Sequence, residues 1–344
     1  MPGRELACLI RDVPLEPGAE VTVEANPEHV TPEWARMMRS AGVSRVSIGV
    51  QSFDPAVLQS LGREHPAEAV QPAVAAVAAA GIPRYSIDLI YGAAGETDES
   101  FRASLEAALS LDPPPQHVSA YALTVEPGTP LAADVRRHPD DDVQAARYEI
   151  ADAVLSGHGL FWYEISNWAV PGEECRHNQN YWRGGNYLGV GCAAHSHSDG
   201  TRWWNLRTPE RYLAAVAEGR STVAVREVLS AAERTFERLE LALRTPAGVP
   251  ADAFGEGLEE LVDAGLVDLV DRAGSPEPRK DAVLTLAGRL LANEVACRLL
   301  PGEGQNGGAP AGVSRRSATY VGSGDHQMQR NSPRSEPIPL SSQA

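Results

Sequence analysis

The chain has 344 residues, of which 43% are hydrophobic and 22% are charged, and its formal net charge is -16. This length allows one large domain plus a smaller one, and the composition is ordinary for a globular protein. The negative charge repels a phosphate backbone, which argues against nucleic-acid binding. No apolar run approaches the roughly 18 residues of a membrane helix, and residues 1–10 do not resemble a signal peptide. We therefore expect a cytoplasmic protein without an integral membrane segment.

The first half of the sequence alternates short β-rich runs with longer helical patterns, from Glu20 to about Ser166. This alternation is typical of parallel β/α units. The expected strands are residues 21–24, 46–51, 85–91, 117–123 and 160–165. The expected helices are residues 32–41, 55–61, 67–80, 99–111 and 141–156. Helix-capping side chains precede three of these helices, at Thr31, Asp54 and Thr97, where an oxygen can accept unpaired backbone N–H groups.

The second half of the sequence divides into three parts. Regular periodicity disappears after Pro171, and glycine, histidine and tryptophan accumulate, so residues 171–228 are expected to be an aperiodic covering segment. Helical patterns around a small β-hairpin predict a winged-helix-like α+β domain over residues 229–300. Its helices contain at least as much acid as base, which favours packing or partner binding over DNA binding. Residues 301–344 are poor in large apolar side chains and are expected to be disordered.

Polar side chains recur near the ends of successive expected strands. Glu24 closes the first strand, Gln51 closes the second, and Asp88 lies on the third. Arg63 follows the helix after the second strand, and Ala122 lies on the fourth. In parallel β/α proteins ligands bind at the carboxyl ends of strands, where carboxylates and a forked guanidinium suit an amino-acid-like nucleoside. The alternative is that these groups cap helices or face water, but their recurrence favours a shared site.

Residues 176–182, RHNQNYW, match neither an amphipathic helix nor an alternating strand. Imidazole and tyrosinate both bind heme iron, and Asn178 could orient the ring of His177 through its second nitrogen. If the run is helical, His177 and Tyr181 share one face. Taken alone, however, the run favours a covering loop in which backbone groups satisfy both side chains.

The four cysteines, Cys8, Cys175, Cys192 and Cys297, are far apart and form no paired-cysteine motif. This spacing suits reduced thiols, and it provides no complete iron–sulfur or zinc ligand set. One weaker candidate for zinc is CAAHSHSDG, with side chains of suitable types at Cys192, His195, His197 and Asp199. The spacing fits no standard motif, so we expect surface or hydrogen-bonding histidines there and no metal site.

Seven motifs occur in one order between about Gly18 and Leu300: EVTVEANPE, GVSRVSIGVQSFD, LGREH, SIDLIYG, HVSAYALTVEPGTP, YEISNWA and RHNQNYW. In this order they resemble the radical S-adenosylmethionine proteins related to oxygen-independent coproporphyrinogen III oxidase. The HN-x-x-Y run, the YEISNWA motif before it and the short C-terminal module resemble the heme chaperones of that family more than the oxidase. The resemblance implies a partial (β/α) barrel, S-adenosylmethionine and a 4Fe-4S cluster.

The resemblance also implies two sets of binding residues and no catalytic side chain. One set falls on positions that contact S-adenosylmethionine in the oxidase: Glu24, Gln51, Arg63, Asp88 and Ala122. The other set is the HN-x-x-Y run, which the resemblance makes a heme-binding motif: His177, Asn178 and Tyr181.

The family's cluster motif, CxxxCxxC, and its GGGTP loop precede the segment at which this sequence begins, and neither is present in it. Cys8 has no partner at the required spacing. Residues 1–170 therefore predict a radical-SAM (β/α) barrel without its first strands. We expect a start codon placed too late, with a real truncation as the alternative, and we expect the 4Fe-4S cluster only in the full-length family.

The resemblance implies a heme chaperone, which binds heme and passes it to heme-accepting proteins with support from S-adenosylmethionine and the cluster. One alternative is an oxygen-independent coproporphyrinogen III oxidase, which decarboxylates propionate side chains by radical chemistry. A third is an inactive truncated protein that binds a partner. Heme and heme acceptors are the expected partners, without nucleic acid, and the sequence leaves a homodimer open.

Overall fold

A six-stranded sheet lies at the centre of the computed structural model, which describes residues 1–272 and 279–299. The strands are ordered β1 (Thr22–Ala25), β2 (Arg45–Gln51), β3 (Arg84–Tyr91), β4 (His117–Ala122), β6 (Asn167–Ala169) and β5 (Phe161–Glu164). The first four are parallel neighbours, as the alternating sequence pattern predicts. Their expected positions are confirmed to within one residue at each end.

The far edge of this sheet differs from the prediction of a simple parallel series. The expected strand at residues 160–165 exists as β5, but β6, which was not predicted, lies between it and β4 and is antiparallel to both. The chain reverses within Ile165 and Ser166, where the Ser166 N–H donates to the Glu164 carboxylate at 3.1 Å. Ile-Ser is not a standard hairpin signal, and the reversal is held by this side-chain contact together with the Ser166 carbonyl, which accepts from the Ala120 N–H at 2.9 Å.

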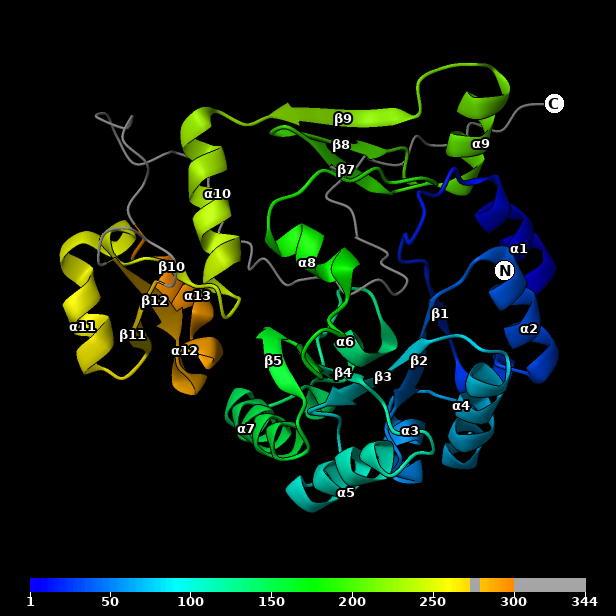
Figure 1. Ribbon diagram of the computed structural model, residues 1–344, viewed down its shortest axis with the longest axis horizontal. Helices are drawn as coiled ribbons and strands as arrows, with labels where there is room; N and C mark the ends of the chain where they lie inside the picture. Colours follow the sequence, from blue (N-terminus) through cyan, green and yellow to red (C-terminus); the bar gives the residue numbers. More distant parts are fainter. Residues whose placement is uncertain (273–278, 300–344) are drawn as a thin grey trace, which may run out of the picture.

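The helices that connect the strands form an arc on one side of the sheet (Figure 1). They are α1 (Gly3–Asp12), α2 (Pro32–Ala41), α3 (Pro55–Ser60), α4 (Val70–Ala79), α5 (Asp98–Leu109) and α7 (Asp141–Gly157). The short helix α6 (Pro130–Ala133) lies outside this arc, below α8 in the view of Figure 1, and short 3-10 turns occur at Pro27–His29, Ala67–Ala69 and Val135–Arg137. All three predicted caps are confirmed. Thr31 accepts from the Trp34 N–H, Asp54 from the Ala56 N–H, and Thr97 from the Ser100 N–H.

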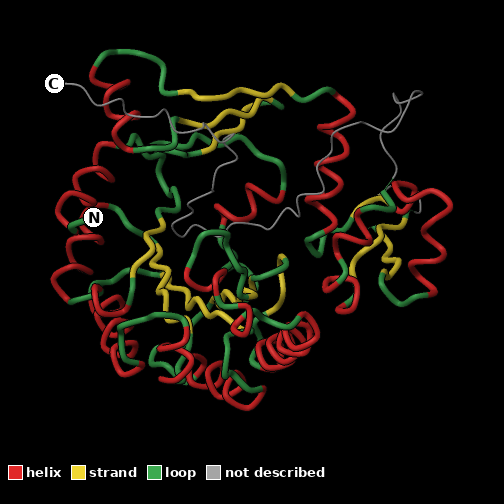
Figure 2. Tube along the Cα trace, turned by 180° about the vertical axis from the view of Figure 1, so that it is seen from behind, coloured by secondary structure: helices red, strands yellow, loops and turns green. Residues whose placement is uncertain are grey.

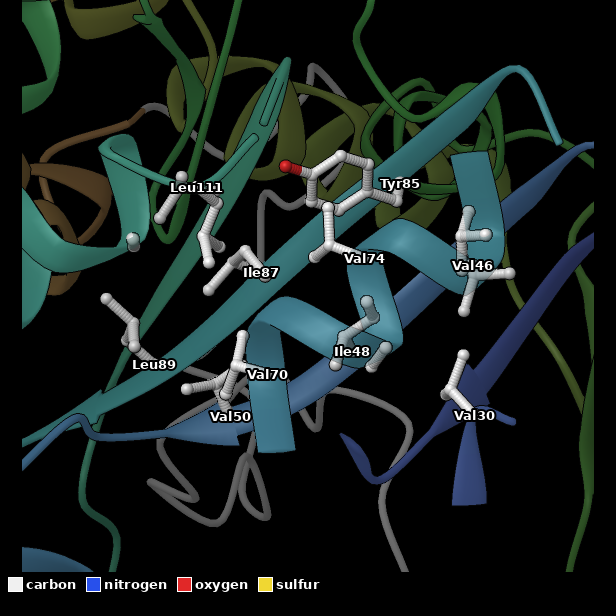
Figure 3. Close-up of a cluster of buried hydrophobic side chains, with 14 of the residues drawn as sticks. Val30, Val46, Ile48, Val50, Val70, Val74, Tyr85, Ile87, Leu89 and Leu111 are labelled. Atoms are coloured by element: carbon white, nitrogen blue, oxygen red, sulfur yellow. The ribbon is translucent and has the colours of Figure 1, made fainter. Parts of the chain in front are cut away.

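The sheet face that meets these helices is apolar. Alternate residues of β2 and β3 are fully buried and pack against Val70 and Val74 of α4, as Figure 3 shows: Val46, Ile48, Val50, Ile87 and Leu89. Burying each such side chain stabilises the fold by about 1.5–3 kcal/mol. Because successive side chains of a strand point to opposite faces, the residues between them face the other side of the sheet.

Residues 171–228 contain regular structure, so the prediction of an aperiodic segment is wrong. They form α8 (Arg176–Trp182), β7 (His195–Ser198), β8 (Thr201–Asn205), α9 (Pro209–Ala217) and β9 (Val223–Val228). The three strands make an antiparallel sheet in the order β7-β8-β9, which lies above α8 in Figure 1. Asp199 and Gly200 join β7 to β8 with φ values of 50° and 81°. Asp-Gly between two strands is a strong hairpin signal, and it was present in the sequence.

The C-terminal part is a small α+β unit with its own core, set to one side of the large sheet (Figure 2). It contains α10 (Ala231–Leu243), β10 (Val249–Pro250), a 3-10 segment (Ala251–Gly257), α11 (Leu258–Asp263), β11 (Val267–Asp271), β12 (Lys280–Leu284), α12 (Leu286–Leu290) and α13 (Ala292–Ala296). Its sheet is antiparallel, in the order β10-β12-β11. The predicted α+β class is confirmed; the predicted tail at residues 301–344 lies outside the described residues.

Within the described ranges, every helix is too short or too polar to cross a membrane.

Arg289 of α12 joins this unit to the large sheet domain. Its guanidinium binds both carboxylate oxygens of Asp152 on α7, at 2.7 and 3.0 Å. The same group lies over the Trp162 ring, 4.6 Å from the centroid, and 5.5 Å from the centroid of Tyr148. Only 8% of the Arg289 side chain is exposed, so the ion pair is largely shielded from water. The contact therefore combines a forked ion pair with cation–π stacking.

We expect Arg289→Gln to lower the free energy of unfolding by about 3 kcal/mol, because it removes the ion-pair partner of a partly buried Asp152 carboxylate and leaves it only the Trp168 indole N–H as a donor. Chemical denaturation measures the change. Arg298→Gln is the matched control, since Arg298 forms an exposed pair with Glu260 that should contribute less than about 1 kcal/mol. Equal effects of the two substitutions would contradict a special role for the Arg289 contact.

Candidate functional site

The second face of the sheet carries a row of polar side chains. Strand register places Glu24 beside Ser47, Asp88 beside Ser119, and Ser119 beside Asn167. The Ser47 hydroxyl donates to Asp88 Oδ2 at 2.6 Å. The two faces of the sheet therefore differ in function. One face forms the hydrophobic core, and the other presents hydrogen-bonding groups near the carboxyl ends of the strands.

Asp88 is the most perturbed of the predicted site residues. Burial raises the pKa of its carboxyl to about 6, Glu24 adds to this effect, and hydrogen bonds from Ser47 and Ser119 oppose it. Its Oδ1 atom is buried and has no hydrogen-bond partner among the described residues. A buried carboxylate oxygen without a donor is rare, because the unmade hydrogen bond costs free energy. Asp88 is therefore suited to accept a hydrogen bond from a bound amine or hydroxyl.

Gln51 ends β2 in a strained conformation, with a φ of 67°. A residue with a side chain rarely adopts this left-handed region, and such strain gathers at functional sites. The pairing of β2 with β3 is irregular at the same point, between Gly49 and Gln51. A Cβ atom on Gly49 would lie 2.9 Å from the Gln51 amide nitrogen, so glycine leaves the space that the Gln51 side chain occupies.

The structure brings only part of the predicted cofactor set together. Glu24, Gln51 and Asp88 lie at the carboxyl ends of neighbouring strands, and Glu24 is close enough to Asp88 to raise its pKa. Ala122 is exposed at the end of β4. Arg63 is exposed after α3, and its side chain makes no hydrogen bond or ion pair with the described part of the chain.

Sequence reasoning missed several polar residues of this face. Glu164 of β5 is fully buried, accepts from the Asn167 side-chain amide, and has a pKa that burial raises to about 7. Tyr121 of β4 is a neighbour whose pKa burial also raises. Alternation along the strands could have found Tyr121 of β4 and Ser47 of β2, because each follows a buried apolar residue that faces the core. Glu164 and Asn167 gave no such signal, since the hairpin that unites them was not predicted.

The run RHNQNYW is helical, forming α8, so the interpretation as a covering loop is wrong. The helix places His177 and Tyr181 on one face, with ring centroids 4.7 Å apart at an interplanar angle of 89°. Partial burial lowers the pKa of His177, and the Glu20 carboxylate opposes this effect. The imidazole is therefore mostly neutral near pH 7, with a lone pair that a metal ion can use.

Asn178 faces the protein interior. Its amide donates to the Tyr163 hydroxyl at 3.2 Å, and the Cys175 N–H donates to the same oxygen at 3.4 Å. The Tyr163 hydroxyl also shares a hydrogen bond of 2.7 Å with Nε2 of His117, and burial and the nearby Arg45 lower the pKa of His117 to about 3, which keeps this imidazole neutral. These contacts tie the start of α8 to β4 and β5. The expected role of Asn178 in orienting His177 stays a prediction.

Glu20 caps α8, although it precedes His177 by 157 residues in the sequence. The helix has no side-chain cap of its own, and the Glu20 carboxylate accepts from the His177 N–H at 3.2 Å and from the Cys175 thiol at 3.4 Å. Its other oxygen lies 3.4 Å from the Arg45 guanidinium, which is 2% exposed and also donates to the Glu173 carbonyl at 2.9 Å. A carboxylate at a helix N-terminus is stabilised by the helix dipole as well as by these donors.

The histidines proposed for zinc have other contacts. His197 Nδ1 donates to the Gly185 carbonyl at 3.0 Å, and its Nε2 accepts from the Gly200 N–H at 3.2 Å. His195 stacks on Trp204 with centroids 5.5 Å apart. The described residues contain no gathered group of three or more histidine, cysteine, aspartate or glutamate side chains that could hold a metal ion.

Comparisons with known proteins agree with these motifs. The model of the radical SAM superfamily matches residues 3–108. The heme chaperone HemW of Mycobacterium tuberculosis (strain H37Rv) is 45% identical over 308 residues, which cover 87% of this chain and 77% of that protein. The chain belongs to the HemW family of heme chaperones. HemW of Bacillus subtilis is 35% identical over 285 residues, covering 80% of this chain and 75% of that one. The predicted family is confirmed.

A solved structure shows that the HemW fold seen here matches that of a radical SAM enzyme. Coproporphyrinogen III oxidase (HemN) from Escherichia coli superposes with a TM-score of 0.72 at 22% identity, covering 87% of this chain and 74% of that one. The predicted radical-SAM α/β fold is confirmed. At this identity the likeness concerns the fold alone, so it does not favour the oxidase alternative.

Membership in this superfamily implies S-adenosylmethionine and a 4Fe-4S cluster. Two features near the strand ends fit S-adenosylmethionine. The Oδ1 atom of Asp88 is buried without a hydrogen-bond partner among the described residues, and Gln51 has a strained backbone that places a polar side chain there. The described residues do not fit the cluster, since their four free cysteines are dispersed and no metal-binding group is gathered.

We expect Asp88→Asn to stabilise the HemW fold near pH 7. The folded pKa of about 6 exceeds the ordinary value of 3.8, so the stability contributed by the protonated carboxyl is lost as pH rises through about 6. At 1.36 kcal/mol per pKa unit, the gain in unfolding free energy is up to about 3 kcal/mol near pH 7 and small near pH 4. Denaturant titrations at both pH values measure it. Asp263→Asn, at an exposed acid, is the control substitution. A gain at Asp88 that is equal at both pH values would contradict the assignment.

We expect Glu20→Ala to loosen α8 selectively. The change removes the cap of the helix and leaves the Arg45 guanidinium buried without its carboxylate, at a cost of about 3 kcal/mol. Hydrogen exchange should accelerate at the amides of residues 177–183 while the amides of α5 keep their protection. Glu16→Ala, an exposed neighbour, is the control. Unchanged exchange in α8 would show that Glu20 does not hold the helix.

Proposed function

We propose that this chain binds heme through His177 and transfers it to acceptor hemoproteins. The observation that carries the proposal is the imidazole of His177, which is accessible, largely neutral at physiological pH and held on a helix whose start is anchored by Glu20. Neutral imidazole is a standard axial ligand of heme iron. The name heme chaperone, carried by the HemW relatives, supports the same conclusion.

Tyr181 lies edge-on to His177 and supports this site in a different way. Burial raises the pKa of its phenol, and the neighbouring Tyr187 adds to the effect. At neutral pH Tyr181 is therefore a neutral phenol rather than a tyrosinate, which makes it an aromatic wall for a porphyrin ring and not the anionic ligand. The roles proposed for this group are iron ligation by His177, ring contact by Tyr181 and anchoring by Asn178.

For S-adenosylmethionine we propose the strand-end residues Glu24, Gln51 and Asp88, with Arg63 and Ala122 at the margin of the same site. Asp88 and Glu24 offer carboxylates to an amine or ribose, and the Gln51 amide offers both a donor and an acceptor. In radical SAM proteins this molecule and the cluster together supply radical chemistry. Heme transfer itself needs no net chemical turnover, so these residues would bind and orient the cofactor in support of the carrier function.

Substituting His177 tests the proposal directly. We expect the wild-type chain to shift the Soret band of hemin on titration, and we expect His177→Ala to lose that shift and to bind at least about tenfold more weakly, because the iron loses its ligand. Absorption spectroscopy measures both the band position and the affinity.

The matched control is His195→Ala, which removes another exposed imidazole from the same half of the chain. It should titrate like the wild type. Transfer is measured by mixing the heme-loaded chain with an apo-hemoprotein and following the acceptor's own spectrum. A hemin titration that is the same in wild type and His177→Ala would overturn the assignment of the ligand.

A further inference from the structure

A cavity of about 380 Å³ lies at the C-terminal end of α8, between the Asp-Gly turn of the β7–β8 hairpin and helix α10. Its lining includes Gly184, His197, Asp199, Arg234 and Arg238. We propose that this cavity binds the propionate carboxylates of a porphyrin. The inference rests on the proposed function, since it assigns the polar edge of the same ligand whose iron His177 would hold.

An aromatic row leads from His177 to the cavity. The centroid of Tyr181 lies 4.7 Å from that of His177, Tyr187 lies 4.5 Å from Tyr181, and His197, which lines the cavity, lies 6.0 Å from Tyr187. Along α8 the rise from His177 to the last helical residue, Trp182, is about 7.5 Å at about 1.5 Å per residue, and Gly184 of the cavity follows two residues later. That separation is comparable to the distance between the iron and the propionates of a heme. The flat rings along this row are suited to contact a porphyrin plane.

Two arginines of α10 give the cavity its ligand preference. Arg234 and Arg238 are four residues apart and therefore lie on one face of the helix. The Arg238 side chain makes no hydrogen bond or ion pair within the described residues, although it lines the cavity. Arg234 uses one nitrogen to hold the Asp199 carbonyl at 3.2 Å and keeps its other donors. Two guanidiniums at this spacing match two carboxylates carried by one molecule, each by a forked pair of hydrogen bonds.

The acids of the cavity do not satisfy these arginines. Glu237 pairs with Arg202 at 2.8 Å, and that guanidinium also binds Glu227 at 2.7 Å. The Asp199 carboxylate accepts from the Asn186 amide at 3.2 Å and from its neighbour Ser198. Each acid thus has donors elsewhere, so the two arginines of α10 remain the groups that an added anion would meet.

The size of the cavity fits an edge of the porphyrin rather than the whole ring. Leu229 and Leu241 add apolar surface, so the site can contact ring carbon atoms beside the carboxylates. The walls come from three segments, the end of α8, the β7–β8 hairpin and α10, which joins the C-terminal unit. A porphyrin seated here would therefore bridge the C-terminal unit and the helix that carries His177.

The double variant Arg234→Gln/Arg238→Gln tests this site with three probes: hemin, hemin dimethyl ester and metal-free protoporphyrin IX. We expect the wild type to bind hemin at least about tenfold more tightly than its ester, which lacks free carboxylates, and we expect the double variant to lose this preference. The Soret band of bound hemin should keep its position, since the iron ligand is unchanged. Fluorescence quenching with protoporphyrin IX should show the same loss of affinity.

The matched control is Arg211→Gln/Arg226→Gln, which removes two exposed guanidiniums outside the cavity and should preserve the preference. Protoporphyrin IX separates the two proposals, because it has the carboxylates but no iron. His177→Ala could leave the hemin spectrum unchanged while the affinity for protoporphyrin IX still depends on Arg234 and Arg238. In that case only the assignment of His177 as the iron ligand is wrong. A wild-type preference for the free acid that persists in the double variant would overturn the cavity assignment.

Discussion

The buried ion pair between Arg45 and Glu20 is the contact on which the arrangement of both sites depends. Arg45 starts β2, the strand that ends at Gln51, and Glu20 caps the helix that carries His177. Because the Arg45 side chain is 2% exposed, separating the pair would leave a charge in a nearly water-free environment. The ion pair therefore links the strand that ends at Gln51 to the helix that carries His177.

The central sheet separates stability from ligand binding by its two faces. The apolar face supplies the core, whereas the polar face retains groups that reduce stability, namely a buried carboxyl at Asp88 and a left-handed residue at Gln51. Evolved folds tolerate such local costs where a ligand repays them on binding. The β7-β8-β9 sheet and α10 form a second, more exposed candidate site, which is lined by aromatic rings and arginines instead of buried acids.

Local signals explain which elements could be predicted from the sequence. β1 to β4 and the caps at Thr31, Asp54 and Thr97 were predictable because each depends on residues within a few positions. The β5–β6 hairpin was not, since the Glu164 side chain takes the place of turn residues. The cofactor candidates followed from strand ends, but Glu164 and Asn167 entered the polar face only through that hairpin. The β7–β8 turn has a local signal in the sequence, the Asp199-Gly200 pair.

By itself the sequence determined the family, the parallel half of the sheet and the identity of the candidate ligand His177, because motifs, alternation and caps are local properties. Tertiary structure alone decided that RHNQNYW is a helix, since seven residues are too few to be stable in isolation and the cap comes from Glu20. It also decided that Arg234 and Arg238 share a cavity with His197. These partners are separated by many residues, so only folding brings their charges and rings into contact.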